Sequence, residues 1–454
     1  MARKIIHGAM GKLFGTDGIR GKAYEYPVTA AMAEKLGGAV VRMLSDGGNT
    51  LVLIGRDTRE SGKMLEEALT QGLVQAGARV MKLGVVPSPA VAMLVGEMKA
   101  TAAVMLTASH NPFSDNGMKI FAGDGFKLSD QLEEELENLL LGNSPCESSG
   151  NGAGIVEDFP QGIEMYLEKA KSSIGAMRLD GMKIVLDAGN GSGYEVGPRI
   201  FRELGAEVIT MAVDPDGRNI NAGCGALHAE AAGRLVKETG ADLGISLDGD
   251  ADRVIFTCAD GRIVSGDRTL GICALSLQRD GKLRGNSFVA TVMSNLGLDE
   301  AMRKSGITVI RAGVGDRLVL ERMRKDVLSF GGENSGHLIF ADHATTGDGI
   351  VSALQICKMM RESGKSLAEL AAIMDEYPST LLNLPVREKP PIENLSKLQA
   401  LIAEAEKEFG NDGRQLIRYS GTEKKIRILV EHKESVEVAR WIAKFRQAIG
   451  EEIG

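Results

Sequence analysis

The sequence has few aromatic residues, few cysteines and no long apolar run. Phe, Trp and Tyr make up 4% of the 454 residues. The five cysteines are scattered, form no C-x-x-C pair and are odd in number, which argues against a disulfide framework or a zinc site and favours a reducing compartment. The longest apolar run, 270–277, is far too short to span a bilayer, and residues 1–14 lack the apolar segment of a signal peptide. We therefore expect a cytoplasmic protein with no membrane partner.

The chain also lacks an excess of basic over acidic residues, since its formal net charge is −8. This balance argues against nucleic acid as a partner, so an anionic substrate would have to be held by local cationic residues. A length of 454 residues exceeds what one hydrophobic core usually organises, and therefore predicts several domains. Glycine, by contrast, is plentiful at 57 residues, which suits tight turns and loops that hold phosphate against backbone N–H groups.

Three short apolar strands followed by a polar loop recur three times along the chain. The expected strands lie at 51–54, 78–83 and 102–106, at 183–186, 207–211 and 242–247, and at 288–292, 308–311 and 327–330. Helical patterns such as 63–76 and 229–239 separate them, and this alternation is typical of parallel α/β layers. In such layers functional residues gather at the carboxyl ends of strands. We expect three similar α/β domains, with mixed but mainly parallel sheets, around a central cleft.

The composition changes near residue 377. Prolines at 378, 385, 390 and 391 predict a linker, and the pattern beyond predicts helix 394–409, strands 415–418 and 425–430, and helix 435–449. This is the layout of a small α+β domain. The predicted boundaries are 1–155, 156–257, 258–376 and 377–454. We interpret the acidic run 133–137 as a solvated helix face without a function.

The segment Thr107-Ala-Ser-His-Asn-Pro112 follows the third apolar strand. A serine before Asn-Pro usually caps a turn, and that simple interpretation remains open at this point. A catalytic interpretation is favoured by the neighbouring His110, by Lys119 ten residues on, and by an acidic motif elsewhere in the chain. A serine hydroxyl needs a base or a metal to act as a nucleophile, and a buried lysine can exchange protons.

The acidic motif is Asp248-Gly-Asp-Ala-Asp-Arg253, directly after a predicted strand. In an extended segment Asp248, Asp250 and Asp252 would share one face, and Gly249 would allow their oxygens to converge. Three close carboxylates repel one another unless a hard cation such as Mg²⁺ lies among them. The alternatives are an acidic surface turn and the aspartate pair of a haloacid-dehalogenase phosphatase. Arg253 could hold phosphate or orient the aspartates.

Three further loops have binding chemistry, although each alone is a weak signal. The segment 332–337 offers Glu333, Ser335 and His337, a set suited to sugar hydroxyls. A phosphate site is predicted at Arg418, Ser420, Gly421 and Thr422, where a guanidinium meets two hydroxyls and a flexible backbone. Near the start, Arg20 lies in the glycine-rich segment 15–21, where a cation could reach a reacting oxygen.

Taken together, the motifs TASHNP (107–112), DGDADR (248–253), GENSGH (332–337) and RYSGTE (418–423) occur in one order over the whole chain. In these motifs the sequence resembles the α-D-phosphohexomutases. Segments 14–21, 108–121, 217–228, 292–298 and 345–349 are most similar to the phosphoglucosamine mutases of that family. Asn334 and Lys424 differ from the Gln and Pro more usual there, and Ala251 replaces a frequent Gly.

The resemblance implies four domains around a cleft, a phosphoserine at Ser109, and one Mg²⁺ per subunit. It assigns the metal to the Ser109 phosphate with Asp248, Asp250 and Asp252. It assigns catalysis to Ser109 with Lys119 and Arg20, and the position of His110 next to the serine makes it a further catalytic candidate. It assigns sugar binding to Glu333, Ser335 and His337, and phosphate binding to Arg418, Ser420, Gly421 and Thr422. Arg253, which could hold phosphate, is a further candidate for substrate binding.

The expected reaction is the interconversion of glucosamine 6-phosphate and glucosamine 1-phosphate through a phosphoserine enzyme and glucosamine 1,6-bisphosphate. The nearest alternative is a phosphomannomutase/phosphoglucomutase with the same mechanism, because Asn334 and Lys424 lie in the sugar and phosphate loops. A phosphatase and a non-catalytic sugar-phosphate binding protein are further alternatives. The expected partner is a small hexosamine or hexose phosphate, and the expected assembly is a monomer or a homodimer.

Overall fold

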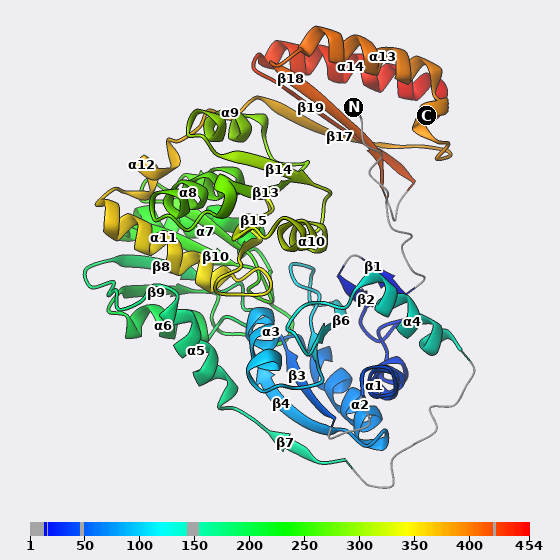
Figure 1. Cartoon of the computed structure of the whole chain (residues 1–454), viewed down its shortest axis with the longest axis vertical. Coiled ribbons are helices and arrows are strands. Elements are labelled where there is room, and N and C mark those ends of the chain that lie inside the picture. Colours follow the sequence, from blue (N-terminus) through cyan, green and yellow to red (C-terminus); the bar gives the residue numbers. More distant parts are fainter. Residues whose placement is uncertain (1–12, 16, 46–49, 143–153, 421–423) are drawn as a thin grey trace. The chain divides into compact units, whose positions relative to one another are not determined.

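The chain folds into two compact units in the computed structural model, which describes residues 13–15, 17–45, 50–142, 154–420 and 424–454 (Figure 1). The large unit comprises Met1–Met293 and Gly306–Ile373, and the small unit comprises Ser294–Ser305 and Met374–Gly454. The predicted fold class, three similar α/β layers and a small C-terminal α+β domain, is confirmed. The predicted domain boundaries and shared cleft remain predictions. Along its described residues the chain has no helix with the length and apolar character needed to cross a membrane.

The first sheet of the large unit has the strand order β1-β2-β6-β5-β3-β4-β7. Its strands are β1 (Phe14–Gly15), β2 (Gly18–Lys22), β3 (Leu51–Arg56), β4 (Arg79–Val85), β5 (Ala102–Leu106), β6 (Asp115–Ala122) and β7 (Val156–Asp158). Its helices are α1 (Ala30–Leu44), α2 (Ser61–Gln75), α3 (Ser88–Glu97) and α4 (Asp130–Leu141). Alternate residues of β3 point to opposite faces. Val52 and Ile54 join one apolar core with α1, α2 and α4, whereas α3 lies on the other side (Figure 1).

The second sheet has the order β12-β11-β10-β8-β9. Its strands are β8 (Lys183–Asp187), β9 (Glu207–Met211), β10 (Leu243–Leu247), β11 (Val254–Cys258) and β12 (Ile263–Val264). The accompanying helices are α5 (Gly162–Ser172), α6 (Val196–Glu203), the 3₁₀ turn η1 (Ala226–His228) and α7 (Ala229–Thr239). Every residue of β10 is buried, as expected for a strand with neighbours on both edges and helices on its faces.

The third sheet has the order β14-β13-β15-β16. Its strands are β13 (Ser287–Thr291), β14 (Thr308–Ala312), β15 (Phe330–Gly332) and β16 (Leu338–Phe340). The helices are α8 (Gly266–Arg279), η2 (Arg284–Asn286), α10 (Asp316–Asp326), α11 (Gly349–Ser363) and α12 (Leu367–Ala371). Side-chain caps start three of them: Ser265 accepts the N–H of Arg268, Asp348 accepts those of Ile350 and Val351, and Ser366 accepts that of Glu369.

The three sheets share one topology, which explains the repeat in the sequence. In each, the three predicted strands pair in parallel with the first in the middle, as in β5-β3-β4, β10-β8-β9 and β15-β13-β14. A fourth strand then returns antiparallel beside the third: β6, β11 or β16. The polar loops that follow the third strands are therefore equivalent connections in three related sheets.

The small unit is an antiparallel sheet, β17-β19-β18, with helices packed against it. Its elements are α9 (Leu296–Lys304), β17 (Ser379–Pro385), η3 (Ile392–Asn394), α13 (Ser396–Phe409), β18 (Gly413–Tyr419), β19 (Lys425–His432) and α14 (Ser435–Glu452). The buried ring of Trp441 packs edge-on against Phe409 and beside Phe445 at the centre of its core.

Three sequence predictions were wrong in detail. Pro385 was predicted to lie in the linker, but it ends β17. This is an edge strand, where a residue without an N–H is tolerated. The strand expected at 327–330 starts only at Phe330, because Val327 ends α10 in a left-handed conformation with φ of 54°. The acidic run is not a uniformly solvated face. Glu137 accepts the N–H groups of Leu13 and Phe14, and Glu133 pairs with Arg317.

Candidate active site

The first two of the three equivalent loops meet. Ser109 lies between β5 and β6, and Asp248 lies between β10 and β11. The Oγ of Ser109 donates a hydrogen bond of 2.7 Å to Oδ2 of Asp248, and both side chains are buried. The structure therefore brings the predicted nucleophile into direct contact with the predicted metal-binding motif, 139 residues away in the sequence.

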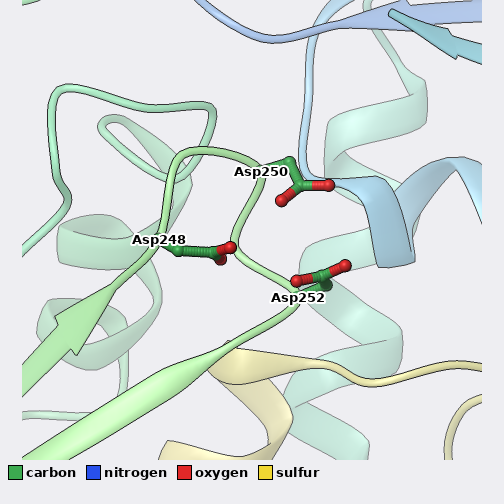
Figure 2. A group of neighbouring side chains, drawn as sticks. All are labelled: Asp248, Asp250 and Asp252. Atoms are coloured by element: carbon green, nitrogen blue, oxygen red, sulfur yellow. The ribbon is translucent and has the colours of Figure 1, made fainter. Parts of the chain in front are cut away.

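The three aspartates of the acidic motif converge, as Figure 2 shows. Asp248, Asp250 and Asp252 are buried, and one oxygen from each lies within 4.8 Å of the others. The side chains do not converge because of the alternation that an extended segment would give. The segment is a turn, in which Ala251 takes a left-handed conformation with φ of 58°. This conformation costs a residue with a Cβ more than it costs glycine.

The carboxylates of this triad fit a metal ion. Oδ1 of Asp250 and Oδ1 of Asp252 are buried without a hydrogen-bond partner among the described residues. Burial, followed by the charges of Asp252 and Asp250, raises the pKa of Asp248 well above its usual value. Orphaned acceptors and like charges at such distances are stabilised by a hard divalent cation with oxygen ligands. The geometry thus indicates a metal site at the carboxyl end of β10.

Lys119 on β6 is the cation nearest the triad in the structure. Its Nζ lies 2.7 Å from Asp250 Oδ2, 3.3 Å from Asp252 Oδ2 and 3.0 Å from Asp17 Oδ2. Burial lowers the pKa of Lys119, but the three carboxylates outweigh this effect and raise it above its usual range. The ammonium form is therefore strongly favoured with this set of partners.

Asp17 is a site residue that the sequence analysis missed. Its carboxylate pairs with Arg20, Lys119 and Lys127, and Lys127 also pairs with Asp316 at the start of α10. Burial would raise the pKa of Asp17, but Lys119, Lys127 and Arg20 together hold it well below its usual value. The predicted cations Arg20 and Lys119 are thus joined through one carboxylate. The only local signal was that Asp17 belongs to the glycine-rich segment that contains Arg20.

His110 stands beside the nucleophile as a neutral imidazole. Burial, with the charges of Arg253 and Arg20, lowers the pKa of His110 to about 4. Its Nδ1 lies 3.2 Å from Arg253 Nη1 and 3.3 Å from Ser109 Oγ. A guanidinium only donates, so Nδ1 acts as the acceptor for Arg253 and the ring proton lies on Nε2. This arrangement leaves Asp248 as the acceptor for the serine hydroxyl.

Ser88 at the start of α3 is a second residue that the sequence analysis missed. Its Oγ donates to Asp250 Oδ2 at 2.6 Å, and its N–H donates to the Asp250 carbonyl at 2.9 Å. Both bonds tie the first sheet's helical layer to the acidic loop. A lone serine before a proline in a helix start offers no pattern from which this contact could be predicted.

The third equivalent loop, between β15 and β16, carries the predicted sugar-binding residues. Glu333 is buried and its Oε1 accepts the N–H of Gly315 at 3.0 Å. Both ring nitrogens of buried His337 lack a hydrogen-bond partner among the described residues, and Asp316 Oδ2 lies 3.9 Å from Nε2. Ser335 and Asn334 are exposed. An unsatisfied buried imidazole beside an exposed hydroxyl is chemistry suited to a polar ligand.

The predicted phosphate loop belongs to the small unit. Arg418 on β18 lies directly opposite Arg427 on β19. Burial and the charge of Arg427 lower the pKa of Arg418. Two guanidinium groups on facing strands repel each other, and an anion between them would offset that repulsion. Ser420 is buried, and its carbonyl accepts a bond of 2.6 Å from Lys389. Gly421 and Thr422 lie outside the described residues.

Comparison with protein families identifies four consecutive domains. Residues 11–145, 164–261 and 265–377 match the α/β/α domains I, II and III of the phosphoglucomutase/phosphomannomutase family. Residues 381–448 match the C-terminal domain of the same family. Together these matches cover most of the chain in the order the family has them.

Solved structures and curated relatives extend the match. A phosphoglucomutase/phosphomannomutase family protein from Burkholderia thailandensis superposes with a TM-score of 0.79 at 25% identity, covering 96% of this chain and 97% of its own. Aspergillus fumigatus N-acetylphosphoglucosamine mutase, solved with GlcNAc-6P and magnesium, shares the fold with a TM-score of 0.65 at 18% identity, over 97% and 96% of the two chains.

Two relatives named phosphoglucosamine mutase, from Geobacter sp. (strain M21) and Syntrophus aciditrophicus, are each 45% identical to this chain. Each alignment covers 98% of this chain, and 99% and 100% of the respective relative. Four domain matches in order and identity over nearly the whole length agree with the convergence of Ser109 and the aspartate triad. The chain belongs to the phosphoglucosamine mutases of the α-D-phosphohexomutase superfamily.

Proposed function

We propose that this chain interconverts glucosamine 6-phosphate and glucosamine 1-phosphate by passing a phosphoryl group through Ser109. The observation that carries the proposal is the 2.7 Å bond between Ser109 Oγ and Asp248 inside a buried aspartate triad. A serine at this position can exchange a phosphoryl group with a sugar hydroxyl beside carboxylates that would hold a metal ion.

In the proposed cycle, phospho-Ser109 gives its phosphoryl group to the free hydroxyl of the sugar phosphate. The bond between phosphorus and the serine oxygen breaks, and a bond to the sugar oxygen forms. The resulting glucosamine 1,6-bisphosphate turns by about half a revolution and returns its other phosphoryl group to Ser109. No inorganic phosphate is released, so the enzyme ends each cycle phosphorylated, as it began.

Asp248, Asp250 and Asp252, with an oxygen of the serine phosphate, would hold one Mg²⁺. When bound, this ion withdraws charge from the transferred phosphoryl group. We assign the exchange of the hydroxyl proton to Lys119, whose Nζ lies beside the triad, 2.7 Å from Asp250 Oδ2. Its ammonium can give a proton to the serine oxygen as the bond to phosphorus breaks, and the amine can then take the proton of the sugar hydroxyl. Arg20 and neutral His110 are assigned to the stabilisation and orientation of charge at the reacting oxygens.

We assign the distal groups of the substrate to the remaining predicted residues. Glu333, Ser335 and His337 are suited to the sugar hydroxyls and amino group, and the unsatisfied ring nitrogens of His337 support this role. Arg418 and Ser420, with Gly421 and Thr422, are suited to the phosphate that does not react, and Arg253 to the one that does. The mechanism requires such a distal site, since the intermediate must be held in two orientations.

A substrate panel tests the proposal. With Mg²⁺ and a trace of the matching 1,6-bisphosphate, kcat/KM is compared for glucosamine, glucose and mannose 6-phosphates, with Ser109→Ala as the inactive control. A large preference for glucosamine 6-phosphate is expected. Equal or better turnover of glucose or mannose phosphate would favour the phosphomannomutase/phosphoglucomutase alternative. Stoichiometric release of inorganic phosphate would instead identify a phosphatase.

A further inference from the structure

The backbone of Ser109 is held at both its N–H and its carbonyl. Ser109 has a φ of 51°, a left-handed conformation that residues with a Cβ rarely adopt. Its N–H donates to Thr107 Oγ1 at 2.9 Å. Its carbonyl accepts two bonds, from Arg59 Nη2 at 2.9 Å and from Asn221 Nδ2 at 3.0 Å. A rare conformation persists only where its surroundings fix it, and here three side chains do so.

Arg59 supplies the part of this support that comes from the first sheet. Its side chain is fully buried, and each of its five N–H donors has an acceptor. Nε pairs with Asp57, and the remaining donors reach the carbonyls of the serine loop: Ser109, Asn111, Pro112 and Asp115. One guanidinium therefore fixes most of the loop between β5 and β6.

Asn221 supplies the part that comes from the second sheet. It belongs to the segment 217–228, which resembles the phosphoglucosamine mutases but has had no role so far. Its Nδ2 reaches the carbonyls of Ser109 at 3.0 Å and Asn111 at 3.2 Å, the same two that Arg59 Nη2 binds. Two cross-sheet donors thus share one pair of acceptors in the serine loop.

Asn221 is itself fixed to the middle strand of the second sheet. Its N–H donates to the Gly189 carbonyl at 2.8 Å. Buried Asp187, the last residue of β8, accepts the N–H groups of Gly189 at 2.9 Å and Gly225 at 2.7 Å. Because β8 pairs directly with β10, the position of the aspartate triad and the position of Asn221 are set by adjacent strands.

We propose that Asn221 is a positioning residue that holds the Ser109 loop in register with the aspartate triad. The role rests on the proposed function of Ser109 as the phosphoryl carrier. Asn221 touches no reacting atom and acts through the Ser109 and Asn111 carbonyls. Its loss removes the second-sheet support of the serine backbone and leaves only the bond from the serine's own Oγ to Asp248, so that the serine oxygen is less closely fixed relative to the triad. Small displacements of a reacting group cost large factors in rate.

The test is Asn221→Gly. Asn221 has a φ of 58°, a conformation that glycine adopts without strain, so this substitution removes the amide while keeping the backbone. We expect kcat to fall about tenfold or more, with KM within a factor of two. Inorganic phosphate released per turnover should rise, because water competes for a misplaced phosphoserine. A loss of stability alone would lower the amount of active enzyme without raising the phosphate released per turnover. Asn286→Gly is the matched control, since Asn286 is exposed with a φ of 44°, and it should leave kcat unchanged.

A second variant, Asn221→Asp, keeps the shape of the side chain and removes its N–H donors, and should reproduce the kcat loss. If both variants keep kcat within a factor of two of the unsubstituted enzyme, the positioning role is refuted. Ser109→Ala distinguishes that result from failure of the proposed function. An inactive Ser109→Ala enzyme with fully active Asn221 variants refutes only the positioning role, whereas an active Ser109→Ala enzyme refutes the phosphoserine mechanism on which it rests.

Discussion

Replacing Tyr166 by Phe should destabilise the large unit by an amount that grows with pH. The hydroxyl of Tyr166, on α5, lies 2.9 Å from each carboxylate oxygen of Asp348, and both residues are buried. Asp348 caps α11, whose first residue, Gly349, donates its N–H to the Ala251 carbonyl of the acidic loop at 2.9 Å. The variant removes one oxygen atom from this buried network and leaves the packing of the ring intact.

The magnitude follows from the charge of the acceptor. A hydrogen bond to a buried charged group is worth about 1.5–3 kcal/mol, so we expect a loss of about 2 kcal/mol at pH 8. Burial raises the pKa of Asp348 to about 6, although the N–H groups of Val351 and Ile350 and the Tyr166 hydroxyl act against it. The native state therefore holds this proton more tightly than the unfolded chain, and stability contributed by Asp348 is lost as pH rises from about 4 to about 6.

The Tyr166 hydroxyl favours the charged form of Asp348, so its removal raises that pKa further. The cost of the substitution should be smallest near pH 5, where Asp348 is mostly protonated, and should approach its full value only near pH 8, because about 2 kcal/mol corresponds to a further rise of about 1.5 in the pKa. Urea unfolding followed by circular dichroism at pH 5, 7 and 8 measures it. Tyr194→Phe is the control in the same unit, because Tyr194 is only half-buried and its hydroxyl has no hydrogen bond to the described residues. Equal midpoints for Tyr166→Phe and the unsubstituted protein, or a loss that does not change with pH, would refute the reasoning.

Three other predictions concern a helix end, a pair of helical glycines and the metal site. Val327→Gly should raise the stability by about 1 kcal/mol, seen as a higher melting temperature, because Val327 is exposed and holds a φ of 54° at the end of α10. Gly72→Ala should cost about 2 kcal/mol or more, since its Cβ would lie 1.9 Å from the Glu34 carbonyl, whereas Gly96→Ala, with open space around it, should slightly stabilise α3. Mg²⁺ at a hundredfold excess over its Kd should stabilise the protein by about 2.7 kcal/mol. Asp248→Asn should abolish that shift, and an equal shift in the variant would argue against the triad as the metal site.

The sheets were largely predictable because their central strands are continuous apolar runs. The run at 102–106 matches the central strand β5 residue for residue, and the edge strand β9 was also predicted with its observed bounds, 207–211. The antiparallel fourth strands were not predicted, since a strand such as β6 begins with the polar, glycine-containing segment Asp-Asn-Gly. Its assignment depends on pairing with β5 and β2, which local sequence does not encode.

The reacting residues were found because each follows a strand in a recognisable motif. The residues that support them were not found, because each one's contacts in the site lie far away in the sequence. Asp17 pairs with Lys119 and Lys127, which lie more than a hundred residues away, and Asn221 binds the carbonyl of a serine 112 residues away. Burial likewise changed the interpretation of Glu137, since an acidic helix face gives no sign that a distant backbone segment binds one of its carboxylates.

The most direct test of the account follows a labelled phosphoryl group through Ser109. The enzyme is phosphorylated with glucosamine 1,6-bisphosphate carrying labelled phosphate, freed of sugar, and mixed with unlabelled glucosamine 6-phosphate for a single turnover. The account predicts label on Ser109, located by peptide fragmentation in a mass spectrometer, followed by its transfer to glucosamine phosphates at the rate of turnover. Label on another residue, or its appearance as inorganic phosphate at that rate, would contradict the account.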